Sequence, residues 1–242
     1  MLPPGPAAPA AVSPLLADLT WPEVRDRVQA GAFLAVPLGA TEQHGPHLPL
    51  STDADIAVAL CRRLAAARPD VLIAPPLGYG SSGEHAGFAG TLSVGQDAVE
   101  LVVLELGRSA TGTFARVLFV SAHGGNSEPV TRAVQRLRAE GRDVAVFSPC
   151  WDGDPHAGFE ETAIQLALRP GSVRMDRSVP GNTRPLAELM PSLRARGVRA
   201  VSPSGILGDP AGATAAAGEA LLDTLAAALI SQVGQWHPEA AA

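Results

Sequence analysis

Short, continuous apolar runs that alternate with helical patterns constrain the fold of this chain more than any other feature. The apolar runs lie at 33–38, 71–75, 117–121 and 143–148. Helical patterns lie at about 53–68, 96–112, 127–140, 158–168 and 212–235. Such alternation is typical of a parallel sheet covered on both faces. The sequence therefore predicts an α/β fold, a single-domain three-layer sandwich with a mostly parallel central sheet flanked by helices.

Two further segments are judged by their local sequence. Thr20 and Glu23 form a capping-box pattern, with Pro22 near the first helical position, and predict a helix that runs to about Ala30. The stretch 170–210 is rich in Pro, Gly and Arg and shows neither helical nor strand periodicity. A loop of that length in a compact domain is often functional.

Composition narrows the class of protein. Apolar residues make up 46 % and charged residues 17 %, which indicates a globular chain with a large core. The net charge of −6, without a run of basic residues, argues against a nucleic-acid partner. Two cysteines, Cys61 and Cys150, are too few for a disulfide framework, so we expect a reducing compartment and a cytoplasmic protein.

The ends of the chain carry little pattern. Residues 1–14 are rich in Pro and Ala and have neither a basic start nor a long apolar stretch. They predict a disordered lead-in, not a signal peptide or a membrane span, and we expect no membrane partner. The folded domain is expected at 15–237, followed by a frayed Ala-rich tail.

The loop after the first apolar run carries side chains that suit a metal ion. Glu42, His44 and Asp53 follow this run closely, and no cysteine lies among them. Carboxylate and imidazole ligands without thiolates suit Zn²⁺, Mn²⁺ or Fe²⁺. Glu42 and His44 are two residues apart on extended backbone, so their side chains point the same way.

Later runs end in similar residues. His123 and His156 each follow a predicted strand, and ligands of open α/β sheets bind beyond the carboxyl ends of strands. We therefore expect these loops to converge. Seen alone, Asp53 is more often a helix N-cap, and one of Glu160 and Glu161 is expected only to complement a helix dipole.

Two other motifs are disfavoured. Gly78–Gly83 matches a dinucleotide-binding fingerprint, but it leads into more glycine-rich loop and lacks the acidic residue expected about 20 positions later. Cys150 near a strand end suits a nucleophile, yet a buried reduced cysteine is the expected interpretation.

Several segments together resemble the creatininase family. The matching segments span about Phe33 to Leu168 and are Gly39–Leu50 with Asp53, Gly80–His85, Phe88–Thr91, His123–Asn126 and His156–Thr162. The later segment 185–210 resembles a peptidase branch of that family in particular. The resemblance implies a creatininase-like fold.

The resemblance also implies two divalent metal ions per subunit, Zn²⁺, Fe²⁺ or Mn²⁺. Glu42, Asp53 and His123 would hold one ion. His44, Asp53 and Glu161 would hold the other, so that Asp53 bridges, and His156 would transfer protons. The resemblance selects Glu161 over Glu160. Creatininase itself has a glutamate where this chain has Gly125, so Glu161 is expected to supply that carboxylate.

The peptidase branch implies a modified precursor peptide as the substrate. Hydrolysis of its Gly–Val amide bond near the C-terminus would release a cross-linked Val-Tyr-derived dipeptide. A cyclic-amide or formamide hydrolase and a non-catalytic metal-stabilised scaffold are the alternatives. Family members also imply a homo-oligomer, a hexamer or similar ring. No substrate-binding residue is assigned, although we hypothesise that arginines help to steer the peptide: Arg174, Arg177, Arg184, Arg194, Arg196 and Arg199.

Overall fold

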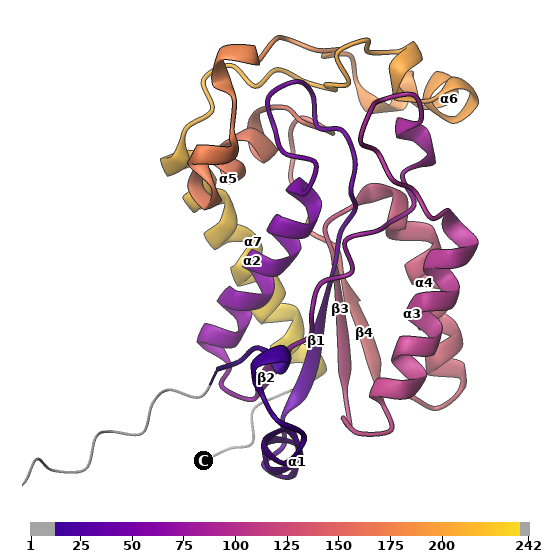
Figure 1. Ribbon diagram of the computed structural model, residues 1–242, viewed down its shortest axis with the longest axis vertical. Helices are drawn as coiled ribbons and strands as arrows, with labels where there is room; N and C mark the ends of the chain where they lie inside the picture. Colours follow the sequence, from indigo (N-terminus) through magenta and orange to yellow (C-terminus); the bar gives the residue numbers. More distant parts are fainter. Residues whose placement is uncertain (1–12, 238–242) are drawn as a thin grey trace, which may run out of the picture.

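Four parallel strands form the centre of the computed structural model, which describes residues 13–237 (Figure 1). They are β1 (Phe33–Leu38), β2 (Val71–Ile73), β3 (Val117–Ser121) and β4 (Val144–Phe147), in the order β2-β1-β3-β4. The register pairs Leu34 with Val117 and Leu38 with Ser121. The predicted α/β fold with a parallel sheet is therefore confirmed, and β2 ends before Pro75-Pro76, where no backbone N–H continues the ladder.

Helices cover both faces of the sheet. On one face lie α2 (Thr52–Ala67), α5 (Phe159–Leu168) and α7 (Ala215–Trp236), and on the other lie α3 (Gln96–Ala110) and α4 (Ser127–Ala139). Alternate residues of each strand separate the two cores. Phe33 and Ala35 pack with the first helix group, whereas Leu34 and Val36 pack with the second.

The remaining helices lie outside these layers. Helix α1 (Trp21–Gln29) begins at the expected capping box, in which the Thr20 N–H donates to Glu23 Oε2 at 2.6 Å. The stretch 170–210 contains α6 (Leu186–Arg196) and short 3-10 turns, and it crosses the carboxyl ends of the strands at the top of Figure 1. The segment without periodicity therefore covers the edge where the candidate side chains emerge.

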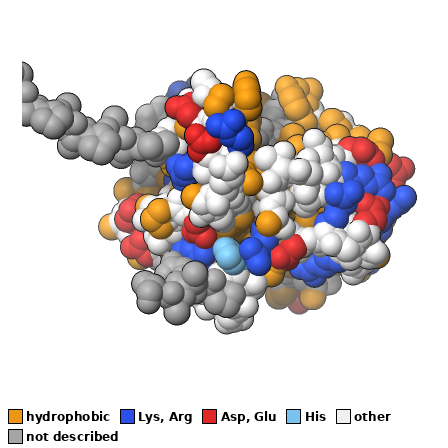
Figure 2. Space-filling model, turned by 90° about the horizontal axis from the view of Figure 1, so that it is seen from below, with side chains coloured by type: hydrophobic (Ala, Val, Ile, Leu, Met, Phe, Trp, Pro, Cys, Tyr) orange, Lys and Arg blue, Asp and Glu red, His pale blue; other side chains and the backbone are white. Residues whose placement is uncertain are grey.

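The opposite end of the molecule carries charges of both signs. Figure 2 views the amino-end face of the sheet, where Arg and acidic side chains are interspersed. A partly exposed ion pair at this end joins Arg116, just before β3, to Asp143, just before β4, at 2.9 Å. Exposed pairs of this kind contribute little stability.

The two ends of the chain need separate mention. Most of the expected lead-in, residues 1–12, lies outside the described residues, as do residues 238–242 beyond the expected domain. Pro14 is described, and its carbonyl accepts a hydrogen bond from the N–H of Ile73 at 2.7 Å. Among the described helices, α7 is long and apolar enough to span a membrane. It buries Leu222, Leu229 and Val233 against the sheet, as core helices do.

Helices α5 and α7 make a backbone contact that we expect to be intolerant of added volume. A Cβ atom at Gly218 in α7 would lie 1.9 Å from the carbonyl oxygen of Ala163 in α5, whereas a Cβ at Gly234 in the same helix would meet nothing within 4 Å. Gly218→Ala should therefore cost about 1–3 kcal/mol of unfolding free energy.

Gly234→Ala is the matched control and should gain up to about 1 kcal/mol from helix propensity. Chemical denaturation of the two variants measures the difference. Equal effects at both positions would show that the two helices do not approach at Gly218.

Candidate metal centre

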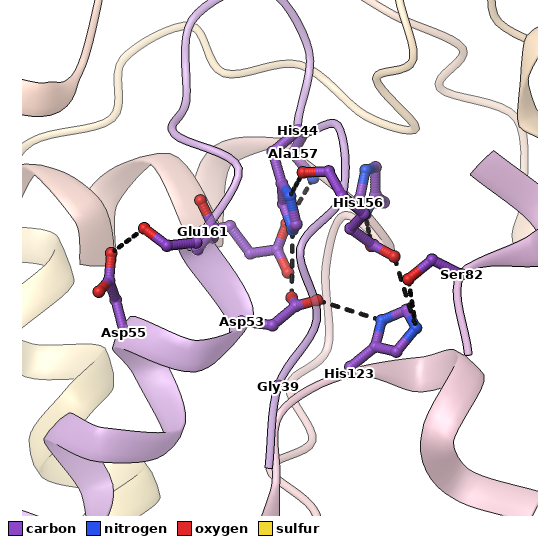
Figure 3. A network of polar contacts seen from close by, with 12 residues as sticks. Gly39, His44, Asp53, Asp55, Ser82, His123, His156, Ala157 and Glu161 are labelled. Atoms are coloured by element: carbon purple, nitrogen blue, oxygen red, sulfur yellow. Dashed lines mark hydrogen bonds and ion pairs between the residues drawn. The ribbon is translucent and has the colours of Figure 1, made fainter. Parts of the chain in front are cut away.

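The side chains singled out in the sequence gather beyond the carboxyl ends of β1, β3 and β4 (Figure 3). Four of them come from loops after strands, and two come from the first turns of helices. The strand-end loops carry Glu42, His44, His123 and His156, and the helix starts of α2 and α5 carry Asp53 and Glu161. The expected convergence of these loops is therefore present in the structure.

Asp53 lies between two imidazoles. Its Oδ1 atom is 3.1 Å from His44 Nε2, and its Oδ2 atom is 3.1 Å from His123 Nδ1. His123 Nε2 is 3.4 Å from Glu42 Oε2, and His44 Nε2 is 3.8 Å from Glu161 Oε2. Each oxygen of Asp53 therefore faces a different cluster of candidate ligands.

Within residues 13–237, ligand atoms lie close enough for one ion in three groups. These groups are Glu42/Asp53/His123, His44/His156/Glu161 and Glu42/His85/His156. The first matches a set that the family resemblance implies. The second differs from the other implied set, because His156 takes the place of Asp53 beside His44 and Glu161. The third contains His85, which the sequence analysis did not assign. The signal for His85 was its place in the Gly80–His85 motif after β2.

The carboxylates of this cluster are buried, and too few hydrogen-bond donors surround their oxygens. Glu42 is completely buried, Asp53 is 2 % exposed, and Glu161 is 5 % exposed. Both carboxylate oxygens of Glu42 and the Oδ2 atom of Asp53 lack a hydrogen-bond donor in suitable geometry. Buried charges are normally paired or bound to a metal, so these oxygens and the flanking imidazoles fit divalent cations.

Protonation of the cluster reflects the same crowding. Burial, followed by the charge of Asp53, raises the pKa of Glu42 to about 8. Burial alone would lower the pKa of His44 and of His123, but nearby carboxylates, Asp53 foremost, raise both to about 10. The same two imidazoles hold the pKa of Asp53 far below its usual range, despite burial. Protons thus occupy the places where cations would balance the carboxylates, and a bound ion would displace them.

Backbone carbonyls orient the two imidazoles beside Asp53. The Ser81 carbonyl lies 2.9 Å from His123 Nε2, and the Glu42 carbonyl lies 3.1 Å from His44 Nδ1. Because a carbonyl oxygen accepts, each of these nitrogens carries the hydrogen of its ring when the ring is neutral. The other nitrogen of each ring, which lies beside Asp53, is then free to bind a cation.

The loop before α5 separates the two adjacent glutamates. Glu160 Oε2 accepts a hydrogen bond from the Asp154 N–H at 3.0 Å and so holds the loop. Glu161 Oε2 faces the cluster and accepts from the Ala157 N–H at 2.6 Å. Ala157 has a φ of +54°, a conformation rare for residues other than glycine and typical of functional sites.

A cleft of about 540 Å³ opens onto the cluster. Its walls come from residues 149–151, 153–155 and 182–186, and Glu42, Asp53 and Glu161 line its floor. Of the six arginines hypothesised to steer a substrate, Arg184 lines this cleft, and the other five lie outside its lining. Cys150 also lines it and is exposed, so the expectation of a buried cysteine was wrong. The loop after β4 places Cys150 beyond the core.

Most of the chain is similar to proteins that are already known. The family model for creatininase, described as creatinine amidohydrolase, matches residues 17–233. A mycofactocin precursor peptide peptidase of Mycolicibacterium smegmatis is 50 % identical over 86 % of each chain. The peptidase of the same name from Mycobacterium ulcerans is 48 % identical over 90 % of this chain and 87 % of its own.

A solved structure supports the same relationship. A creatininase variant of the Zn–Zn type superposes with a TM-score of 0.81 at 27 % identity, covering 94 % of this chain and 99 % of that one. The family match extends over most of the sequence and includes every segment that builds the cluster. The chain therefore belongs to the creatininase family.

Proposed function

We propose that this protein is a metal-dependent peptidase that acts on the modified mycofactocin precursor peptide. It would hydrolyse the Gly–Val amide bond near the peptide's C-terminus and release the cross-linked Val-Tyr-derived dipeptide. The relatives that are 48 % and 50 % identical, both named for this substrate, support the proposal. The observation that carries the chemistry is the set of buried carboxylate oxygens without donors at the floor of an open cleft.

The cluster would hold two divalent ions. Glu42, Asp53 and His123 would hold one ion, and His44, Asp53 and Glu161 would hold the other, with Asp53 shared. Zn²⁺, Fe²⁺ and Mn²⁺ all suit oxygen and imidazole ligands. When bound, such a pair would acidify water and polarise the amide carbonyl.

His156 would supply the proton that the departing nitrogen needs, because an amine anion is a poor leaving group without general-acid help. It lines the same cleft as the cluster, and its ring lies 4.4 Å from the His44 ring, centre to centre. Burial, followed by the charge of His44, lowers its pKa well below the usual range. A neutral imidazole at this place can accept a proton and then pass it on.

A small-molecule cyclic-amide or formamide hydrolase is the alternative within the family. Gly125 supports the peptidase over creatinine hydrolysis, because no side chain at that position can supply the carboxylate expected in creatininase itself. Neighbouring atoms also fill the place: a Cβ atom there would lie 2.1 Å from the Ser81 carbonyl oxygen.

We also propose a cytoplasmic homo-oligomer, a hexamer or similar ring. Exposed apolar side chains support assembly, since a second copy would cover them. They lie on α3 and the loops before it and include Tyr79, Leu92, Val94, Leu101 and Val102.

Incubation with precursor peptide that carries the modified Val-Tyr pair tests the proposed reaction. We expect mass spectrometry to detect the released dipeptide with metal-loaded protein and not after chelation. Readdition of Zn²⁺, Fe²⁺ or Mn²⁺ should restore release. Creatinine serves as the alternative substrate, and its hydrolysis without peptide cleavage would contradict the peptidase function.

Metal binding should also appear as thermal stability. An ion that binds the folded chain alone, at 100 times its dissociation constant, adds about 2.7 kcal/mol. The melting temperature of chelator-treated protein should therefore rise on addition of Zn²⁺ or Mn²⁺. The rise should be smaller in Glu42→Gln, which lacks one buried carboxylate, and an equal rise in both proteins would argue against Glu42 as a ligand.

Asp53 and Asp55 provide a matched pair within the first turn of α2. Asp53→Ala should remove bound metal and lower kcat/KM at least about 10³-fold, because both ions would share this carboxylate. Asp55 accepts hydrogen bonds from Arg169 at 2.8 Å and Ser51 at 2.9 Å, outside the cluster. Asp55→Ala should keep both metal and activity. Elemental analysis and peptide hydrolysis measure the two variants, and equal losses would refute the bridging role.

A further inference from the structure

The Gln43 side chain lies at the centre of the cluster although it is neither a candidate ligand nor a nucleophile. It stands between Glu42 and His44 in sequence and is only 4 % exposed. Its amide contacts four segments of the chain: its own loop at Gly45, the turn at His85, the loop at His156 and the loop at Gly205. An amide so placed can fix where protons lie on its neighbours.

One contact fixes the orientation of the amide. The Gly45 N–H donates to Gln43 Oε1 at 2.8 Å, so the other terminal atom of the side chain is the NH₂ group. That group has two hydrogens. It lies 2.7 Å from His85 Nδ1 and 3.1 Å from the Gly205 carbonyl oxygen, and both partners accept a hydrogen bond.

The contacts of Gln43 also show which ring nitrogen of His156 carries the proton. His156 Nε2 lies 3.0 Å from the Gln43 NH₂ nitrogen and 2.9 Å from the Gln43 backbone carbonyl oxygen. The carbonyl oxygen can only accept, so Nε2 carries the hydrogen and donates it there. The approach of Nε2 to the NH₂ nitrogen is then a contact between two donors, and the NH₂ hydrogens go to His85 Nδ1 and the Gly205 carbonyl. A neutral His156 then carries its lone pair on Nδ1, which lies 3.8 Å from Glu42 Oε1.

The same contacts show which ring nitrogen of His85 carries the proton. Because His85 Nδ1 accepts from Gln43, the proton of the neutral ring lies on Nε2, which is 3.4 Å from Glu42 Oε1. The His85 nitrogen nearest the carboxylate therefore carries a hydrogen and has no lone pair, although its geometry does not make a hydrogen bond to Glu42. The group Glu42/His85/His156 has ligand-like spacing but lacks the free imidazole nitrogen of His85 that a cation would need.

We propose that Gln43 is a positioning residue that fixes the tautomer of His85 through its side-chain amide and that of His156 through its backbone carbonyl. It makes His156 present Nδ1 as its free nitrogen, and it places the His85 hydrogen on the nitrogen that lies nearest Glu42. The catalytic consequence rests on the proposed function, whereas the tautomers themselves do not.

Gly205 keeps the amide in place. A Cβ atom at this residue would lie 1.9 Å from Gln43 Oε1, and the backbone φ of +84° also favours glycine. A larger residue at Gly205 would thus displace the Gln43 side chain. Gly205 itself lies in a segment that carries none of the proposed ligands. It gives a second, independent way to disturb the same amide.

Nitrogen NMR of ¹⁵N-histidine-labelled, Zn²⁺-loaded protein tests the proposal directly. Long-range ¹H–¹⁵N correlation distinguishes protonated from unprotonated ring nitrogens, and His156→Ala and His85→Ala assign the two rings. Wild-type protein should show protonated Nε2 and free Nδ1 for His156, with protonated Nε2 for His85. Gln43→Leu and Gly205→Ala should each give mixed tautomers at His85, whereas His156 should keep a protonated Nε2, because its acceptor is the backbone carbonyl of position 43.

Activity and metal content complete the test. With the modified peptide, Gln43→Leu should lower kcat about 10–100-fold, as loss of outer-shell partners does, with KM little changed. Zinc content should stay at the wild-type value in Gln43→Leu. Gln165→Leu is the control, since Gln165 is a completely buried glutamine whose amide contacts the Thr52 carbonyl and Asp55 instead. It should leave both tautomers unchanged.

A wild-type spectrum with His156 protonated on Nδ1 would overturn the proposal, whether or not any variant folds. An unchanged tautomer of His85 in a folded Gln43→Leu protein would overturn it as well. The spectra need no peptide, so an absence of peptidase activity in the wild type would contradict the proposed function and leave the assignment of the tautomers to be judged by NMR alone.

Discussion

Three carboxylates share a buried space that provides too few hydrogen-bond donors for them. Glu42, Asp53 and Glu161 are all at most 5 % exposed, and their mutual repulsion must be balanced inside the fold. His44 and His123 balance it in part, by retaining protons on either side of Asp53. Divalent cations would balance it more completely, which explains why residues that are costly to bury are gathered here.

The parallel sheet makes this gathering possible. Loops after β1, β3 and β4 all leave the same edge, so residues more than 100 positions apart in sequence, such as Gln43 and His156 with a separation of 113, reach one point. Close packing of small residues then sets the spacing. A Cβ atom at Gly39 would lie 2.4 Å from the Ala54 backbone nitrogen, so the loop after β1 can approach the start of α2 only with glycine there.

Around the ligands, a second layer of contacts controls orientation. Backbone carbonyls of Glu42 and Ser81 hold the rings beside Asp53, while the amide of Gln43 joins His85, His156 and the loop at Gly205. The stretch 170–210 adds the outer wall of the cleft through residues 182–186. The site thus combines a rigid floor on the sheet with a wall from an irregular segment that no period in the sequence describes.

The order of residues was enough to predict the parallel sheet, the helices that cover it and the strand-end loops that converge. Apolar runs and helical periods are local properties, and the direction of parallel strands then dictates where their loops meet. Spacing could not choose between Glu160 and Glu161, and it could not reveal Gln43 and His85 in the cluster. These assignments needed the folded chain, because each depends on side-chain contacts that no local pattern specifies. The loop before α5 turns so that the Asp154 N–H takes Glu160 as its acceptor, which leaves Glu161 to face the cluster.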